Sequence, residues 1–300
     1  MSLGVGAALA ALALPAGAPT LSLAANDGAD AAPPQRVVSI NVCTDQLAML
    51  IARPGQLLSV SSLATDPQTS LMTAEASAHT LNHGAAEEIF LMKPDLVLAG
   101  TYTRRPTVAL LQRLGFPVEQ FAPATSFDDI RANIRRMGAL LGRRDRAEAL
   151  VAELDARLEA TRTATQGKEN RRRAGLTFAN SYTSGAGTLS QAALDAAGLE
   201  NIAKDFGVRG MARLPLEALV MADPDLVVSS TKDYGAPALA GETIRHPAYR
   251  ALAREKTSVD VPTRYWVCGG PFTVEAVRIL REAADSPAAD NLAATARRKP

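Results

Sequence analysis

The sequence predicts an α/β protein with two parallel-sheet lobes that are bridged by one long α-helix. Three observations support this prediction: strand patterns alternate with helix patterns, one helix-turn-strand unit occurs twice, and a long helical pattern separates the two copies. Strands that alternate with helices form parallel sheets, because each helix returns the chain to the same end of the sheet.

The repeated unit covers residues 87–100 (EEIFLMKPDLVLAG) and residues 217–230 (EALVMADPDLVVSS). The copies share Glu, Pro, Asp, Leu and Val at equivalent positions, and each runs from a helical pattern through a Pro-Asp turn into an apolar strand. This internal similarity predicts two related lobes, one on each side of the long helix.

The long helix is predicted over residues 145–166, where apolar residues recur at intervals of three and four. The apolar positions are Ala147, Leu150, Val151, Leu154 and Leu158. Charged residues occupy the other side, so one face should be buried. Asp145 and Glu148 resemble a capping box, and Gly167 is a natural stop. Such a helix would span roughly 33 Å, enough to connect two lobes.

The chain begins with an apolar run at residues 3–15, which is followed by the small-x-small pattern Ser22-Leu23-Ala24. This pattern predicts a signal peptide over residues 1–25, although the usual basic segment is missing and a disordered Ala-rich tail is the alternative. No cysteine follows the run, so we expect a freely diffusing periplasmic protein and not a lipoprotein. Regular structure should begin near Arg36.

The predicted N-terminal lobe covers residues 36–143, the connecting helix 144–166 and the C-terminal lobe 167–285, before a flexible tail at 286–300. In the first lobe we expect strands at 36–41, 57–61, 95–99 and 117–121, and helices at 44–51, 86–92, 106–114 and 126–141. In the second lobe, besides the repeated helix and strand, we expect strands at 174–179 and 258–261 and helices at 191–197, 248–254 and 273–284.

Composition narrows the class of function. The chain has 300 residues, of which 47% are hydrophobic and 21% charged, which suffices for one large or two medium domains with buried cores. The net charge of +1, with both signs interspersed, argues against a nucleic-acid partner. After the first segment no apolar run is long enough to span a membrane.

Several segments together resemble a known family. They are residues 36–51 (RVVSINVCTDQLAMLI), the two repeated units, the run at residues 102–118 and the single central helix. In order and spacing they are similar to the periplasmic binding proteins of cobalamin and iron-siderophore ABC importers, over residues 36–284. The resemblance implies a ligand cleft between two lobes. It also implies a monomer that delivers a metal chelate to an importer permease and its ATPase.

Ligands of open parallel sheets bind beyond the carboxyl ends of the strands, so the residues that follow each strand are the candidates. They are Cys43, Thr44, Leu63, Asp66, Tyr102, Arg104, Arg105, Asn180, Tyr182, Arg264, Tyr265, Trp266 and Cys268. Aromatic residues make up only 4% of the chain, yet four of them fall in these loops. Aromatic walls and arginine donors suit a ferric siderophore, with cobalamin or haem as the alternative. The competing interpretation is that Tyr265 and Trp266 only pack at the base of a loop.

Glu87 and Glu217 occupy equivalent places at the helix start of the two repeated units. A carboxylate there could simply stabilise the helix dipole. The resemblance implies instead that each glutamate docks onto arginines of the permease, and two related glutamates fit a twofold partner.

The two cysteines, Cys43 and Cys268, lie at a strand-to-helix junction in different lobes. Export favours a disulfide across the base of the cleft, and a pair of thiols beneath the ligand is the alternative. Together with three scattered histidines they form no recognisable metal site. We expect no cofactor, because any metal would arrive inside the ligand.

An enzyme is the competing class. A thiol hydrolase built on Cys43 would need a base that no local motif supplies, and the sequence contains no phosphate loop. A binding protein for bare metal ions would need converging histidine and carboxylate ligands, which these loops lack. The sequence therefore predicts a binding protein without catalytic activity.

Overall fold

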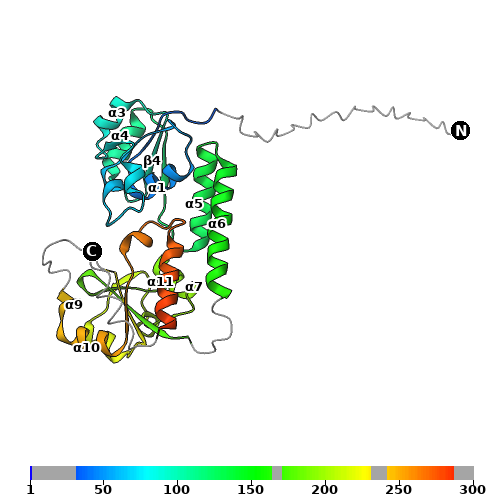
Figure 1. Ribbon diagram of the computed structural model, residues 1–300. Coiled ribbons are helices and arrows are strands. Elements are labelled where there is room, and N and C mark those ends of the chain that lie inside the picture. Colours follow the sequence, from blue (N-terminus) through cyan, green and yellow to red (C-terminus); the bar gives the residue numbers. More distant parts are fainter. Residues whose placement is uncertain (2–31, 164–170, 231–241, 287–300) are drawn as a thin grey trace. The chain divides into compact units, whose positions relative to one another are not determined.

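The computed structural model describes Met1 and residues 32–163, 171–230 and 242–286 (Figure 1). All of the predicted signal peptide except Met1, the end of the predicted connecting helix and all but the first residue of the predicted tail lie outside these residues. One compact unit begins at Pro33. The domain boundaries expected at residues 36, 143 and 167 stay predictions.

The N-terminal lobe contains a five-stranded parallel sheet in the order β3-β2-β1-β4-β5. Its strands are β1 (Val37–Ser39), β2 (Leu57–Ser61), β3 (Thr80–Asn82), β4 (Leu96–Gly100) and β5 (Val118–Phe121). Its helices are α1 (Val42–Ile51), η1 (Ser62–Thr65), α2 (Thr73–Ala76), α3 (Ala86–Met92), α4 (Arg105–Arg113) and α5 (Phe127–Leu140). The register places Val37 of the central strand opposite Leu57 on one side and Leu96 on the other.

The C-terminal lobe contains a four-stranded parallel sheet in the order β11-β10-β6-β8 and an antiparallel pair, β7 with β9. The strands are β6 (Arg173–Phe178), β7 (Tyr182–Ser184), β8 (Glu200–Asn201), β9 (Met211–Arg213), β10 (Leu226–Ser230) and β11 (Thr257–Asp260). The helices are η2 (Ala179–Ser181), α7 (Leu189–Ala196), η3 (Ile202–Phe206), α8 (Leu216–Met221), α9 (Glu242–Arg245), α10 (Pro247–Glu255), η5 (Thr263–Tyr265) and α11 (Thr273–Asp285).

The α/β fold with two parallel sheets is therefore confirmed, and the predicted strands and helices of both lobes lie within about two residues of their expected ends. The short strands β3, β7, β8 and β9 were not predicted, because two or three residues carry no readable alternation of apolar and polar side chains.

The sequence repeat is also a structural repeat. Helix α3 leads into β4, and α8 leads into β10, through a turn whose first residue has a positive φ: 47° at Lys93 and 44° at Asp223. The aspartate of each Pro-Asp turn then accepts a hydrogen bond from the backbone at the start of the neighbouring strand. Asp95 Oδ1 accepts from Arg36 N at 2.9 Å, and Asp225 Oδ2 accepts from Arg173 N at 2.8 Å. In both lobes the equivalent aspartate thus ties the repeated strand to the strand beside it, β1 in one sheet and β6 in the other.

Helix α6 (Arg144–Thr163) is the predicted long helix, and its predicted apolar face is buried. This face belongs to one continuous core that takes in Val37 of the N-terminal sheet and Leu176 of the C-terminal sheet. Helix α5 runs beside α6 (Figure 1), and Gly138 makes this close approach possible because a Cβ there would lie 2.3 Å from Ala147 Cβ. No helix of the described residues is long and apolar enough to cross a membrane.

The predicted capping box at the start of this helix is wrong. The helix begins at Arg144, so Asp145 lies inside the first turn and does not precede it. Glu148 pairs instead with Arg135 of α5, with an Oε1 to Nε distance of 2.9 Å. The long-range cation is a better partner for Glu148 than a local amide, since it carries a full charge.

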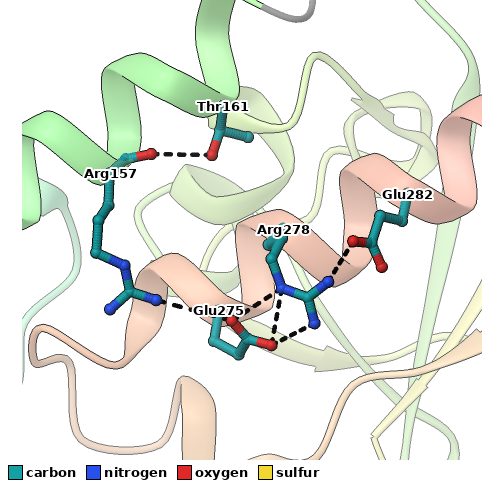
Figure 2. Close-up of polar contacts among 5 residues, drawn as sticks. All are labelled: Arg157, Thr161, Glu275, Arg278 and Glu282. Carbon is teal, nitrogen blue, oxygen red and sulfur yellow. Dashed lines mark hydrogen bonds and ion pairs between the residues drawn. The ribbon is translucent and has the colours of Figure 1, made fainter.

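Charged side chains also join α6 to α11 (Figure 2). Arg157 Nη2 lies 3.8 Å from Glu275 Oε2, and Arg278 Nε donates to Glu275 Oε1 at 2.9 Å. Arg278, which also pairs with Glu282, holds the pKa of Glu275 below its usual value. Exposed ion pairs of this kind contribute only about 0.2–1 kcal/mol each, so apolar packing is the main force that holds α6 in place.

Candidate functional site

The candidate site begins where β1 passes into α1. Asn41 caps the helix, and its Oδ1 accepts a hydrogen bond from Cys43 N at 3.0 Å. The cap fixes Cys43 in the first helical turn, at the carboxyl end of the central strand of the sheet. This is the end at which open parallel sheets bind their ligands.

A disulfide joins Cys43 to Cys268 of the C-terminal lobe, with a Cα–Cα distance of 4.9 Å. The predicted approach of the two cysteines is confirmed, in its bonded form. The next residue, Gly269, has a φ of +64°, and a Cβ there would lie 2.6 Å from Ala124 Cβ in the N-terminal lobe. Only glycine meets both conditions without strain, so the disulfide lies in a tight contact between the lobes.

Arg264 of η5 makes a second connection between the lobes. Its Nη1 donates to the carbonyl oxygen of Pro67, which follows η1, at 3.2 Å. The guanidinium also lies 5.3 Å from the ring centroid of Tyr265, within the range of a cation–π contact. Arg264 was expected to face a ligand. Its guanidinium also helps to hold the two lobes together.

Both cysteines of the disulfide line a small hollow between α1 and the segment that leads into α11. The hollow is lined by Cys43, Gln46, Leu47, Arg264, Tyr265, Cys268, Gly269, Gly270 and Phe272. Its volume of about 10 Å³ is the space of about one water molecule. Sites for small molecules occupy about 300–1,000 Å³, so a metal chelate cannot sit inside this hollow.

The hollow unites four of the predicted ligand-binding residues: Cys43, Arg264, Tyr265 and Cys268. It adds Gln46, Leu47 and Phe272, which the sequence did not indicate. The sequence did not mark these three residues as ligand-binding candidates because each lies inside or beside a helical pattern and does not directly follow a strand.

Two predicted ligand-binding residues, Thr44 and Trp266, are buried. Trp266 is only 5% exposed, its indole N–H donates to Ser230 Oγ at 3.1 Å, and its ring lies 6.0 Å from that of Phe178. This burial favours the packing alternative for Trp266, and its contact with a ligand stays a prediction. Thr44 is also buried, and its hydroxyl donates to the carbonyl oxygen of Asn41 at 3.0 Å.

Asp45, which the sequence analysis did not single out, is a fully buried carboxylic acid beside the disulfide-bonded turn. Its Oδ2 accepts a hydrogen bond from Ser61 N at 3.1 Å and another from the Ser61 hydroxyl, while Oδ1 has no hydrogen-bond partner in the structure as described. Burial raises the pKa of Asp45 to about 7, although these hydrogen bonds oppose the rise. The one sequence signal was its place three residues before the buried Ala48, on the inner face of α1.

The remaining candidates are more exposed. Tyr102 is 87% exposed in the turn between β4 and α4, and Arg104 and Arg105 follow it at the surface. Leu63 and Asn180 are exposed on their own turns, Asp66 is half-buried, and Tyr182 lies 5.7 Å from the guanidinium of Arg213. The union of these residues in one pocket stays a prediction.

Glu87 and Glu217 are exposed in the first turns of α3 and α8. Neither carboxylate caps its helix, because Ala85 and Pro215 hold the cap positions without a side-chain hydrogen bond. Both carboxylates are therefore available to a partner.

The part of the chain that the structure describes contains no group of three or more His, Cys, Asp or Glu side chains that could hold a metal ion. The disulfide also removes the thiolates that would be the strongest ligands for a soft metal.

Comparison with known proteins adds a family to this geometry. The profile of a family described as periplasmic binding protein matches residues 37–256. A cobalamin-binding protein of Halobacterium salinarum is 32% identical over 65% of this chain, and the match spans about half of that relative, 54% of its length.

Solved structures share the fold. A possible iron-binding, periplasmic solute-binding protein of Staphylococcus epidermidis superposes with a TM-score of 0.68 and 19% identity, over 85% of this chain and 100% of its own. A periplasmic haem-binding protein of Pseudomonas aeruginosa superposes with a TM-score of 0.68 and 21% identity, over 83% of this chain and 92% of its own. The periplasmic vitamin B12 binding protein of Vibrio cholerae superposes with a TM-score of 0.64 and 19% identity, over 84% of this chain and 97% of its own. At these identities the structures establish the two-lobed architecture alone.

Proposed function

Because this chain belongs to the family of periplasmic binding proteins, we propose that it captures a metal chelate between its lobes and delivers it to an ABC importer. The observation that carries the proposal is the meeting of strand-end loops from both sheets at the Cys43–Cys268 disulfide. A ligand that rests above this junction would touch both lobes at once. We place the protein in the periplasm, as a monomer.

We propose cobalamin as the ligand to test before all others. The 32% identical relative is a cobalamin-binding protein, and its similarity to this chain is higher than that of the solved structures named above. The exposed ring of Tyr102 offers a flat apolar face of the kind that a corrin ring can stack on. The sequence alone favoured a ferric siderophore over cobalamin, and this relative reverses the order of the two candidate ligands.

A ferric siderophore is the second candidate, and a different observation favours it. Arg104 and Arg105 are exposed beside Tyr102, and Arg264 lies at the hollow. Guanidinium groups bind carboxylate and catecholate oxygens through paired donors, so these arginines suit an anionic chelate. Haem, which has two carboxylates, would use the same groups.

The proposed partner is the permease of an importer, bound to its ATPase, and the proposed contacts are Glu87 and Glu217. We assign no reaction to the chain, because the family consists of binding proteins and the thiol that a hydrolase would need is held in a disulfide. Capture and release then depend on the two lobes and on the permease.

The test is titration of the purified, oxidised protein with cyanocobalamin, a ferric hydroxamate, a ferric catecholate and haemin, followed by isothermal calorimetry and native mass spectrometry. We expect one cyanocobalamin to bind per chain, with a Kd in the micromolar range or tighter. Stoichiometric binding of a siderophore in its place would support the second candidate. Failure of all four chelates to bind would refute the proposed function.

A further inference from the structure

Helices α3 and α8 expose large apolar side chains at equivalent positions. Leu91 of α3 is 78% exposed, and its counterpart Met221 of α8 is 84% exposed. Phe90 and its counterpart Val220 are exposed as well. Single exposed apolar residues are common on protein surfaces, but the same pair on both copies of a repeat is not expected from chance exposure.

Leu91, Val220 and Met221 do not belong to the buried core, and Phe90 reaches its edge only through the ring of Phe116. Each helix packs on its sheet through one main side chain, Ile89 in α3 and Leu219 in α8, and both are buried. The exposed pairs lie on the other side, and polar residues there would leave the core intact. An apolar pair in both lobes therefore needs another explanation.

The exposed pairs also lie beside the two glutamates. Phe90 and Leu91 come three and four residues after Glu87, and the same spacing separates Val220 and Met221 from Glu217. Residues at these intervals share one face of a helix. We name Glu87, Phe90 and Leu91 the N patch, and Glu217, Val220 and Met221 the C patch.

We propose that the two patches are a bipartite docking surface, in which the apolar pairs insert into two copies of one apolar socket on the importer permease. This inference rests on the proposed function and adds to it the residues that supply the contact area. The glutamates then form the charged edge of each contact, facing cationic side chains of the permease. An apolar centre with a charged edge is the usual anatomy of a protein interface.

The duplication identifies the kind of partner. Two equivalent patches within one chain match a partner that presents the same socket twice, as a complex of two related subunits does. Each three-residue patch is too small for a stable interface, so strong binding requires both patches at once. Association of two copies of this chain through the patches would bring glutamates together, which is unfavourable.

The N patch is the more rigid of the two. The ring of Phe90 contacts that of Phe116 edge to face, with centroids 6.0 Å apart. A side chain that is already held loses less conformational entropy on binding. We therefore expect substitutions in the N patch to have the larger effect.

The experiment measures binding of the full chain to permease–ATPase complexes from the native host, reconstituted in nanodiscs, with cobalamin and iron-chelate importers assayed in parallel. Three double variants are compared with the wild type: Leu91→Ser with Met221→Ser, Glu87→Lys with Glu217→Lys, and the control Leu114→Ser with Met211→Ser. The control removes two apolar side chains that are also exposed but lie outside the patches. Thermal midpoints show that each variant is folded.

We expect the Leu91 and Met221 double variant to weaken permease binding about tenfold or more. The control should stay within about twofold, as surface substitutions outside a contact do. If the glutamate reversals abolish binding while the apolar double variant binds like the wild type, the inference is overturned and the proposed function stands. If no importer binds the wild type, the proposed function fails with it. Analytical ultracentrifugation gives the oligomeric state. If the wild type is a dimer and the Leu91 and Met221 double variant is a monomer, the patches bind a second copy of this chain, and the proposal that they bind the permease is overturned.

Discussion

The strand-end loops fall into two regions with opposite properties, which we call the cleft floor and the cleft rim. The floor consists of Cys43, Thr44, Asp45, Trp266 and Cys268, which are bonded to one another or to neighbouring residues and are buried or half-buried. The rim consists of Leu63, Tyr102, Arg104, Arg105 and Asn180, which are exposed. Both regions follow strands, so this position in the sequence identifies an end of the sheet but does not determine exposure.

The connection that follows each strand accounts for the difference. After β1 the chain enters α1 almost at once, and the cap by Asn41 turns Thr44 and Asp45 toward the sheet. After β4 a turn intervenes, in which the Thr103 hydroxyl accepts a hydrogen bond from Gly100 N at 3.0 Å. Tyr102 lies at the tip of this turn and has no sheet to cover it. Floor residues should therefore act through stability and rim residues through recognition.

The largest expected effect separates Trp266 from Tyr102. Trp266→Ala should lower the free energy of unfolding by about 3–5 kcal/mol, because it leaves a cavity and removes the hydrogen bond from the indole to Ser230 Oγ. Tyr102→Ala should change it by less than about 0.5 kcal/mol. Urea denaturation followed by circular dichroism measures both. An unchanged midpoint in the Trp266 variant would place this residue on the rim.

The next effect concerns the disulfide of the floor. Replacement of both cysteines by Ser should cost about 2–4 kcal/mol of stability, since the bond restrains the unfolded chain. Reduction of the wild type should lower stability by a similar amount and should leave the double variant unchanged. Thiol titration of the denatured, unreduced protein should find no free thiol. Two free thiols per chain would contradict the bonded floor.

Asp45 should make the floor sensitive to pH. Its pKa is about 7 in the folded protein and lies near 3.8 without burial, so the folded state binds more protons than the unfolded state between these values. The contribution of Asp45 to stability is therefore full at low pH and decreases as pH rises from about 4 to 7. Asp45→Asn should remove this decrease. Unfolding midpoints of the wild type and the variant at pH 5 and pH 8 provide the measurement, and parallel profiles would exclude a raised pKa.

The smallest expected effect is on the rim. Tyr102→Ala should weaken binding of cyanocobalamin by on the order of tenfold through loss of one stacking face. Calorimetry measures the change, and Tyr249→Phe, a change in a buried residue of the C-terminal lobe, is the matched control. Equal affinity in the wild type and the Tyr102 variant would remove Tyr102 from the binding surface.

The sequence by itself determined the order of the longer strands and helices, the repeated unit and the buried face of α6. These features depend on periodicity and turn chemistry within short segments, as in the two Pro-Asp turns, whose first residue has a positive φ in both copies. The sequence also allows only one disulfide pairing within the chain, because the chain has only two cysteines.

Only the tertiary structure decided which strand-end residues face solvent. Trp266 is buried because Phe178 and Ser230, which are distant in the sequence, surround it. Asp45 has a raised pKa because the sheet covers it, and the hollow is small because Gly269 allows the lobes to meet at Ala124. Burial is a sum over neighbours from many segments, and a periodic pattern in one segment does not contain that sum.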